Sequence, residues 1–139
     1  MGNATKYIFL ILLVLFFSCE DSKYISNCDE CSDEEPLETV LSAEFSEANQ
    51  KGTLVMLYEG RIEDNIVFDS IRIFSTYKYE KRVSINRTYT ITATYIINNK
   101  SYTVVDSTTP RTKYTETLCE KPCYFVYDRM LDLRLKYTK

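Results

Sequence analysis

Residues 87–95, RTYTITATY, carry the clearest structural signal in this sequence. Two rows of side chains alternate along the segment: Tyr89, Ile91, Ala93 and Tyr95 in one row, and Thr88, Thr90, Thr92 and Thr94 in the other. A period of two places each row on its own face of a β-strand, and aromatic and β-branched residues favour strands. The segment therefore predicts a strand with one apolar face and one hydroxyl face.

The flanking sequence predicts more short strands and almost no helix. Asn98 and Asn99 fit a tight hairpin turn, since Asn tolerates positive φ, and residues 101–106 return as the partner strand. Further strands are expected at residues 37–45, 53–59, 66–68, 70–74, 124–127 and 131–137, with 76–80 less regular. The polar residues 107–118 predict a loop, and 119–123 a tight bend. Six to eight short strands with turns between them predict an all-β, antiparallel sandwich over residues 37–139.

The N-terminal residues 7–21, YIFLILLVLFFSCED, predict an export signal. Lys6 precedes an apolar run over residues 7–17, which is shorter than the roughly 20 residues of a membrane-spanning helix and fits a signal peptide. The end of the run, FFSC at 16–19, resembles a bacterial lipobox, with aromatic residues as in lipoproteins of the Bacteroidetes. The resemblance implies a signal helix over residues 1–18, acyl chains such as palmitate on Cys19, and an outer-membrane anchor on the periplasmic or surface face.

The charge distribution predicts a spacer after the signal. Residues 20–48 hold ten acidic side chains and one base, Lys23, whereas residues 49–139 hold fifteen bases and ten acids. A polar, acidic stretch without hydrophobic period indicates a flexible tether, which we place at residues 19–36. The basic excess of the body is scattered, and it excludes the clustered footprint of a nucleic-acid-binding protein.

Four cysteines remain in the mature chain, at Cys28, Cys31, Cys119 and Cys123. An even number in an exported protein predicts structural disulfides. The four allow three connectivities: two would join the start of the domain to its end, and the third would close two local loops. A four-cysteine zinc site and a thioredoxin-like redox pair are the alternatives. Disulfides are favoured, so no metal and no cofactor is expected.

Composition argues against an enzyme. The sequence has no histidine, which excludes Ser-His, Cys-His and His-metal sites. Only Gly52 and Gly60 remain in the mature chain, too few for a phosphate-binding loop. The acidic pairs formed by Glu59 with Glu63, or by Glu63 and Asp64 with Asp69, adjoin turn residues and are interpreted as solvated. We therefore expect no catalytic residues.

The tyrosines divide into two predicted groups. Core or sheet-face packing is expected for Tyr58, Tyr89, Tyr95 and Tyr102. Exposure is expected for Tyr77, Tyr79 and Tyr114, where aromatic rings can stack on sugars or fill pockets of a partner protein.

Several segments together resemble small Bacteroidetes lipoproteins. They are LYEGRIEDN at 57–65, the Tyr/Thr strand, INNKSY at 97–102 and CYFVYDRMLDLRLKY at 123–137. Such proteins carry a transthyretin-like or carboxypeptidase-regulatory-like sandwich, an immunoglobulin-like architecture, and most are non-catalytic. The resemblance implies this fold over most of residues 37–137 and carries over no functional residues. Asp69-Ser70-Ile71 and Asp106-Ser107-Thr108 are similar to the O-glycosylation signal of that group, which makes Ser107 and Ser70 candidate modification sites.

The sequence thus predicts a non-enzymatic, lipid-anchored module of the cell envelope with an accessory or structural role. The first alternative is a surface module that binds a glycan or an envelope protein. The second is a metal-binding or redox protein that uses the four cysteines.

Overall fold

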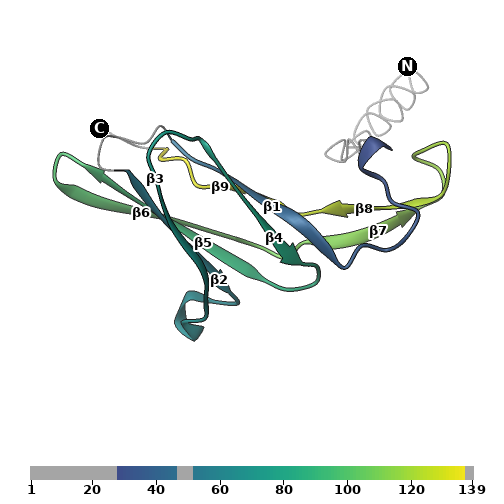
Figure 1. Ribbon diagram of the computed structural model, residues 1–139, viewed down its shortest axis with the longest axis horizontal. Helices are drawn as coiled ribbons and strands as arrows, with labels where there is room; N and C mark the ends of the chain where they lie inside the picture. The colour runs from purple at the N-terminus through teal and green to yellow at the C-terminus, as the bar shows by residue number, and fades with distance from the viewer. Residues whose placement is uncertain (1–27, 47–51, 137–139) are drawn as a thin grey trace, which may run out of the picture.

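The computed structural model describes residues 28–46 and 52–136, and its regular structure is almost entirely β-strand (Figure 1). The described strands are β1 (Glu38–Glu44), β2 (Thr53–Glu59), β3 (Val67–Ile73), β4 (Lys78–Ser84), β5 (Tyr89–Ile97), β6 (Lys100–Thr108), β7 (Arg111–Thr115), β8 (Cys123–Tyr127) and β9 (Met130–Asp132). The described residues also contain two short 3-10 helices, η2 (Cys28–Glu30) and η3 (Ile62–Asp64). The signal peptide predicted at 1–18 and the lipidation predicted at Cys19 lie outside the described residues.

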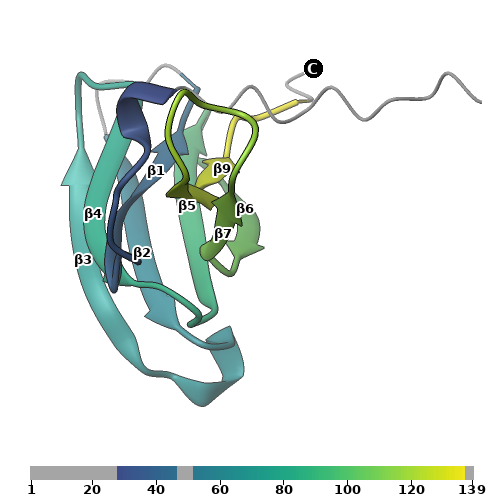
Figure 2. The same ribbon diagram turned by 90° about the vertical axis from the view of Figure 1, so that its right-hand side faces the viewer.

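The strands form two sheets that share one core, and a third, two-stranded sheet. The order is β4-β1-β9 in the first sheet, β3-β2-β5-β6 in the second and β7-β8 in the third. All pairs are antiparallel except β1 with β9, where Ala43 lies opposite Leu131 in a parallel pair. The predicted all-β sandwich is therefore confirmed. The β7-β8 hairpin projects from one end of the sandwich in Figure 1 and points toward the viewer in Figure 2; we call it the arm.

Strand β5 lies inside the second sheet, between β2 and β6, as its regular alternation predicts. Its apolar row is buried and joins one core cluster with residues of both sheets: Leu41, Ala43, Phe45, Val55, Leu57, Ile73, Tyr79, Val83, Tyr89, Ile91, Ala93, Tyr95, Leu131 and Leu133. Ile91 pairs with Leu57 on β2, and both are fully buried. This continuous apolar layer stabilises the sandwich, because burying such side chains contributes about 1.5–3 kcal/mol each.

The hydroxyl row of β5 lies on the other face of the same sheet. Thr92 pairs with Met56, and Thr90 pairs with Tyr58 and donates its hydroxyl to the carbonyl of Gly60 at 2.7 Å. Asn98 and Asn99 form the predicted turn to β6, with φ of 50° and 60°. These are left-handed conformations that Asn adopts more readily than most residues.

Strand β4 is longer than the irregular segment predicted at 76–80. Tyr79 is buried, so its predicted exposure is wrong. Its hydroxyl donates to Asp69 on β3 at 2.7 Å, and the ammonium group of Lys81 contacts the same carboxylate at 3.0 Å. These contacts close the sandwich edge between β3 and β4, and they explain why a strand with so many charges is part of the sandwich.

The loop predicted at 107–118 is wrong for most of its length. Ser107 and Thr108 end strand β6, and Arg111–Thr115 forms β7, which pairs with β8. The buried Pro110 separates the two strands, and its carbonyl accepts the backbone N–H of Asn86 at 2.8 Å. Because the arm exposes most of β7 on both faces, this strand lacks the apolar alternation by which strands are predicted.

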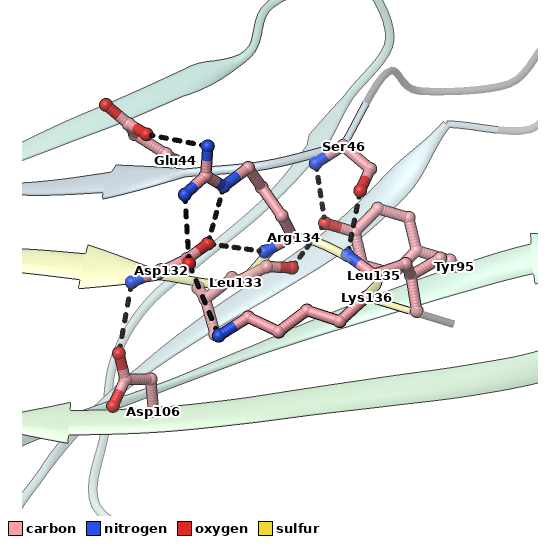
Figure 3. A network of polar contacts seen from close by, with 9 residues as sticks. All are labelled: Glu44, Ser46, Tyr95, Asp106, Asp132, Leu133, Arg134, Leu135 and Lys136. Carbon is pink, nitrogen blue, oxygen red and sulfur yellow. Dashed lines mark hydrogen bonds and ion pairs between the residues drawn. The ribbon is translucent and has the colours of Figure 1, made fainter. Parts of the chain in front are cut away.

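The last strand is shorter than the predicted 131–137. Strand β9 ends at Asp132. Beyond it, hydrogen bonds that involve side chains hold the chain in place (Figure 3). The Tyr95 hydroxyl donates to the carbonyl of Leu133 at 2.7 Å and accepts the N–H of Ser46 at 3.2 Å. The N–H of Leu135 donates to the Ser46 hydroxyl at 2.8 Å. Tyr137 lies outside the described residues.

Candidate functional site

Two disulfides clamp the start of the described chain onto the arm. Cys28 is bonded to Cys119 and Cys31 to Cys123, so the structure selects one of the two connectivities that join the start of the domain to its end. Ser32 adds a β-bridge to Tyr124, with both backbone hydrogen bonds made, at 2.8 and 2.7 Å. The clamp is thus both covalent and hydrogen-bonded.

Polar side chains extend the clamp along the arm. The Thr112 hydroxyl donates to Glu35 at 2.8 Å, and Arg129 forms an ion pair with Glu30. Residues 28–36 are therefore fixed to the arm, and the flexible tether predicted at 19–36 is wrong for them. The acidic composition that indicated a tether instead supplies partners for side chains on and beside the arm. Residues 19–27 lie outside the described residues.

The sulfur atoms of the two disulfides form one cluster. The Sγ atoms of Cys31, Cys119 and Cys123 all lie within 4.8 Å of one another. Their close approach is what a four-cysteine zinc site would need, but zinc binds the thiolate form of cysteine. Each of the four sulfurs is bonded to another sulfur and offers no thiolate in this state, so the predicted structural disulfides are what the geometry supports.

The arm also forms one wall of a polar pocket of about 400 Å³ where it joins the sandwich. The pocket is lined by Thr88, Ser107, Thr108, Thr109, Arg111 and Asp128. These residues come from the link before β5, the end of β6, the link between β6 and β7, the start of β7 and the link between β8 and β9. Sequence reasoning singled out only Ser107 among them, because the pocket forms from segments distant in the chain.

Hydrogen bonds between the segments hold the pocket in shape. The hydroxyls of Thr88 and Thr109 lie 2.8 Å apart and share a hydrogen bond. The Thr108 hydroxyl donates to the backbone carbonyl of Asp128 at 2.6 Å. Asp128 has a φ of 55°, a left-handed conformation that is uncommon outside glycine and enriched in Asn and Asp.

Within the described residues, the two charged side chains of the pocket have no hydrogen-bond or ion-pair partner. Arg111 and Asp128 are both exposed and do not pair with each other. The arginines nearest in sequence to pocket residues are engaged elsewhere: Arg87 pairs with Glu59, and Arg129 pairs with Glu30. Arg111 is therefore the guanidinium group available to a ligand here.

Three acids of the predicted pairs, Glu59, Asp64 and Asp69, have structural partners in the fold. Asp64 accepts the backbone N–H of Arg61 at 3.0 Å. Hydrogen bonds from Tyr79 and Lys81 hold the pKa of the Asp69 carboxyl below its ordinary value, and burial together with Asp69 raises the pKa of Tyr79. These acids thus brace the fold.

The C-terminal segment contains a second perturbed carboxyl (Figure 3). Arg134 binds Asp132 through two nitrogens, at 2.8 and 3.0 Å, and lowers the pKa of that carboxyl well below its usual range. The Asp132 N–H donates to Asp106 at 3.0 Å, so these contacts fix β9 to β6. The arrangement is a brace at the surface between the C-terminal segment and β6.

The candidate glycosylation sites and the exposed tyrosines are dispersed. Ser107 is exposed near the end of β6, and Ser70 is exposed on β3. Tyr77, Tyr102 and Tyr114 are 59%, 39% and 48% exposed, so Tyr102 is not part of the core. They lie before β4, on β6 and on β7, three separate places rather than one sheet face.

Comparisons of the chain with protein-family models, curated proteins and solved structures found no match. In the described part of the chain, none of the helices has the length and apolar character needed to cross a bilayer.

Proposed function

We propose that this protein is a non-enzymatic module of the bacterial cell envelope, anchored through lipid on Cys19, with an accessory or structural role. The observation that carries the proposal is the clamp of residues 28–36 onto the arm. Nine residue steps separate Cys19 from Cys28, and such a length spans at most about 30 Å. The arm end of the sandwich would then stay close to the membrane.

Three further features support this proposal. The apolar run before Cys19 has the length of a signal peptide. Two disulfides suit an oxidising compartment outside the cytoplasm. The β5–β6 hairpin, with Asn98 and Asn99, lies at the opposite end of the sandwich from the arm (Figure 1). An anchor at the arm would therefore direct this hairpin away from the membrane.

The experiment is metabolic labelling with a clickable palmitate analogue in a bacterial host that matures lipoproteins. The wild-type chain should take up the label, and Cys19→Ser should not. Cys28→Ser is the matched control, because it removes a cysteine of the clamp and should leave labelling unchanged. A wild-type chain that takes up no label, or a Cys19→Ser variant that keeps it, would exclude the lipid anchor. Protease treatment of intact cells would then distinguish the surface face from the periplasmic face.

A second candidate function is binding of a glycan or an envelope protein. The polar pocket at the base of the arm favours this candidate, because it carries an arginine without a described partner. The exposed tyrosines give it less support, since they lie on separate elements.

A further inference from the structure

The polar pocket between the arm and the sandwich is large enough to hold a small ligand. Its volume of about 400 Å³ lies within the roughly 300–1,000 Å³ range of such sites. A hydrogen bond between the Thr88 and Thr109 hydroxyls and another from the Thr108 hydroxyl to the Asp128 carbonyl connect its walls. The braced walls lower the cost of ordering the pocket's backbone, so mainly the side chains that contact the ligand remain to be ordered.

The lining residues define the chemistry of the ligand. Hydroxyl groups come from four of them, and each hydroxyl can both donate and accept hydrogen bonds. The Ser107 hydroxyl has no partner among the described residues. None of the six lining side chains is a large apolar group. The pocket therefore suits a small ligand rich in hydroxyl groups, and it offers nothing to an apolar one.

The two charged side chains of the pocket narrow the choice of ligand further. The planar guanidinium of Arg111 presents paired N–H donors that match a carboxylate. Asp128 can only accept, so it suits hydroxyl groups of a ligand and repels additional negative charge. A phosphate or a polysulfate would meet this repulsion, whereas a ligand with a single carboxylate and several hydroxyls satisfies both side chains.

We propose that the pocket of Arg111, Asp128 and the surrounding hydroxyls binds the terminal hexuronic acid of an acidic saccharide. In this arrangement Arg111 binds the sugar carboxylate. Asp128 and Ser107 bind ring hydroxyls. The site does not depend on the lipid anchor, so the proposal can hold or fail independently of it.

The probe is methyl β-D-glucuronide, titrated into the full chain and followed by saturation-transfer NMR. A detergent without a sugar head group avoids competition for the pocket, and a laboratory host without the O-glycosylation system leaves the Ser107 hydroxyl free. Methyl β-D-glucoside tests the need for the carboxylate, acetate tests the need for the sugar ring, and inorganic phosphate tests a simple anion site.

The glucuronide should bind at least about tenfold more tightly than the glucoside, acetate or phosphate, which is the effect of roughly one charge-assisted hydrogen bond. Arg111→Gln should remove the advantage of glucuronide over glucoside. Arg111→Lys, which keeps the charge and loses the paired donors, should retain part of it. Arg82→Gln, on the exposed face of β4, is the matched control and should bind as the wild type does.

Three results would overturn the proposal. The first is no binding of the glucuronide by the wild-type chain up to tens of millimolar. The second is equal binding of acetate or phosphate, which would make the pocket a simple anion site. The third is equal binding by Arg111→Gln in a sample whose melting temperature matches that of the wild type.

Discussion

The sandwich and the arm are both β-structure, yet different forces hold them together. In the sandwich, the two sheets enclose one continuous apolar cluster. In the arm, only Thr115, Cys123 and Phe125 are buried, and two disulfides with a β-bridge supply the attachment of residues 28–36. The contrast shows that cross-links can replace a core where a structure is too thin to bury one.

The two disulfides do not contribute equally to stability. Each joins residues far apart in sequence, with separations of 91 and 92. Once either bond is made, the other closes only the few residues between neighbouring cysteines. Because cross-linking restricts the unfolded chain mainly by the length of loop closed, the first bond provides most of the stabilisation.

Removal of both disulfides should have the largest effect. Replacing Cys28, Cys31, Cys119 and Cys123 by Ser should lower the free energy of unfolding by about 4–5 kcal/mol, the entropic value for a loop of this length. Cys28→Ser with Cys119→Ser should cost much less, because Cys31–Cys123 still closes the long loop. Urea unfolding measures both. Equal losses in the double and quadruple variants would contradict the shared-loop argument.

Truncation of a side chain in the sandwich core should have the next largest effect on the free energy of unfolding. Ile91→Ala on β5 removes a fully buried side chain and should cost about 3 kcal/mol, within the usual range for such cavities. The matched change in the arm, Val126→Ala, removes a partly exposed side chain and should cost less than about 1 kcal/mol. Similar losses in the two variants, measured by thermal and urea unfolding, would show that the arm depends on apolar packing as the sandwich does.

The hydroxyl of Tyr95 should contribute less to the free energy of unfolding than the apolar core around it. Tyr95→Phe leaves the Leu133 carbonyl and the Ser46 N–H without this partner, at an expected cost of about 1–3 kcal/mol. Tyr102→Phe is the control, because that ring is 39% exposed on β6 and should lose almost nothing. A neutral effect of Tyr95→Phe on urea unfolding would mean that the C-terminal segment is not held by this contact.

Loss of the hydrogen bond between Tyr79 and Asp69 should cause a smaller change in the free energy of unfolding, and this change should depend on pH. Because the folded-state pKa of Asp69 lies below its ordinary value of 3.8, its stabilisation is complete above that value and is lost as the pH falls through the lowered folded pKa. Tyr79→Phe should cost about 1–2 kcal/mol at pH 7. The variant should also lose less stability than the wild type on acidification to about pH 3.

The surface ion pair between Glu30 and Arg129, beside the arm, provides the control for that comparison. Glu30→Gln removes the partner of Arg129, and it should change the free energy of unfolding by less than about 1 kcal/mol, as is usual for surface pairs. Parallel acid dependence of Tyr79→Phe and the wild type would exclude the proposed role of Asp69.

The sequence predicts the sandwich better than the arm, for a physical reason. Strands with one buried face, such as β2 and β5, repeat apolar residues with a period of two. In β4, the inward row includes Lys81, whose charge is neutralised by Asp69 only in the folded structure. In β7, almost no side chain is buried, so nothing in its composition distinguishes it from a loop.

The disulfides and the pocket also differ in how far the sequence predicts them. The four cysteines are predictable because their chemistry is rare and their number is even, although the pairing needs the fold. The pocket is not predictable, since Thr88, Arg111 and Asp128 are common surface residues that only the topology brings together. The sequence predicts a solvated tether at the acidic residues 28–36, because it does not show that Glu30 and Glu35 have partners on and beside the arm.

Hydrogen–deuterium exchange before and after reduction with a phosphine tests the central claim most directly, namely that covalent links hold the arm while apolar packing holds the sandwich. After reduction, the amides of β7, β8 and residues 28–36 should lose their protection, while those of β2 and β5 should stay protected, with exchange accelerated by no more than the fall in the global free energy of unfolding. Simultaneous loss of protection in β5 and β7, or an arm that stays protected after full reduction, would contradict the claim.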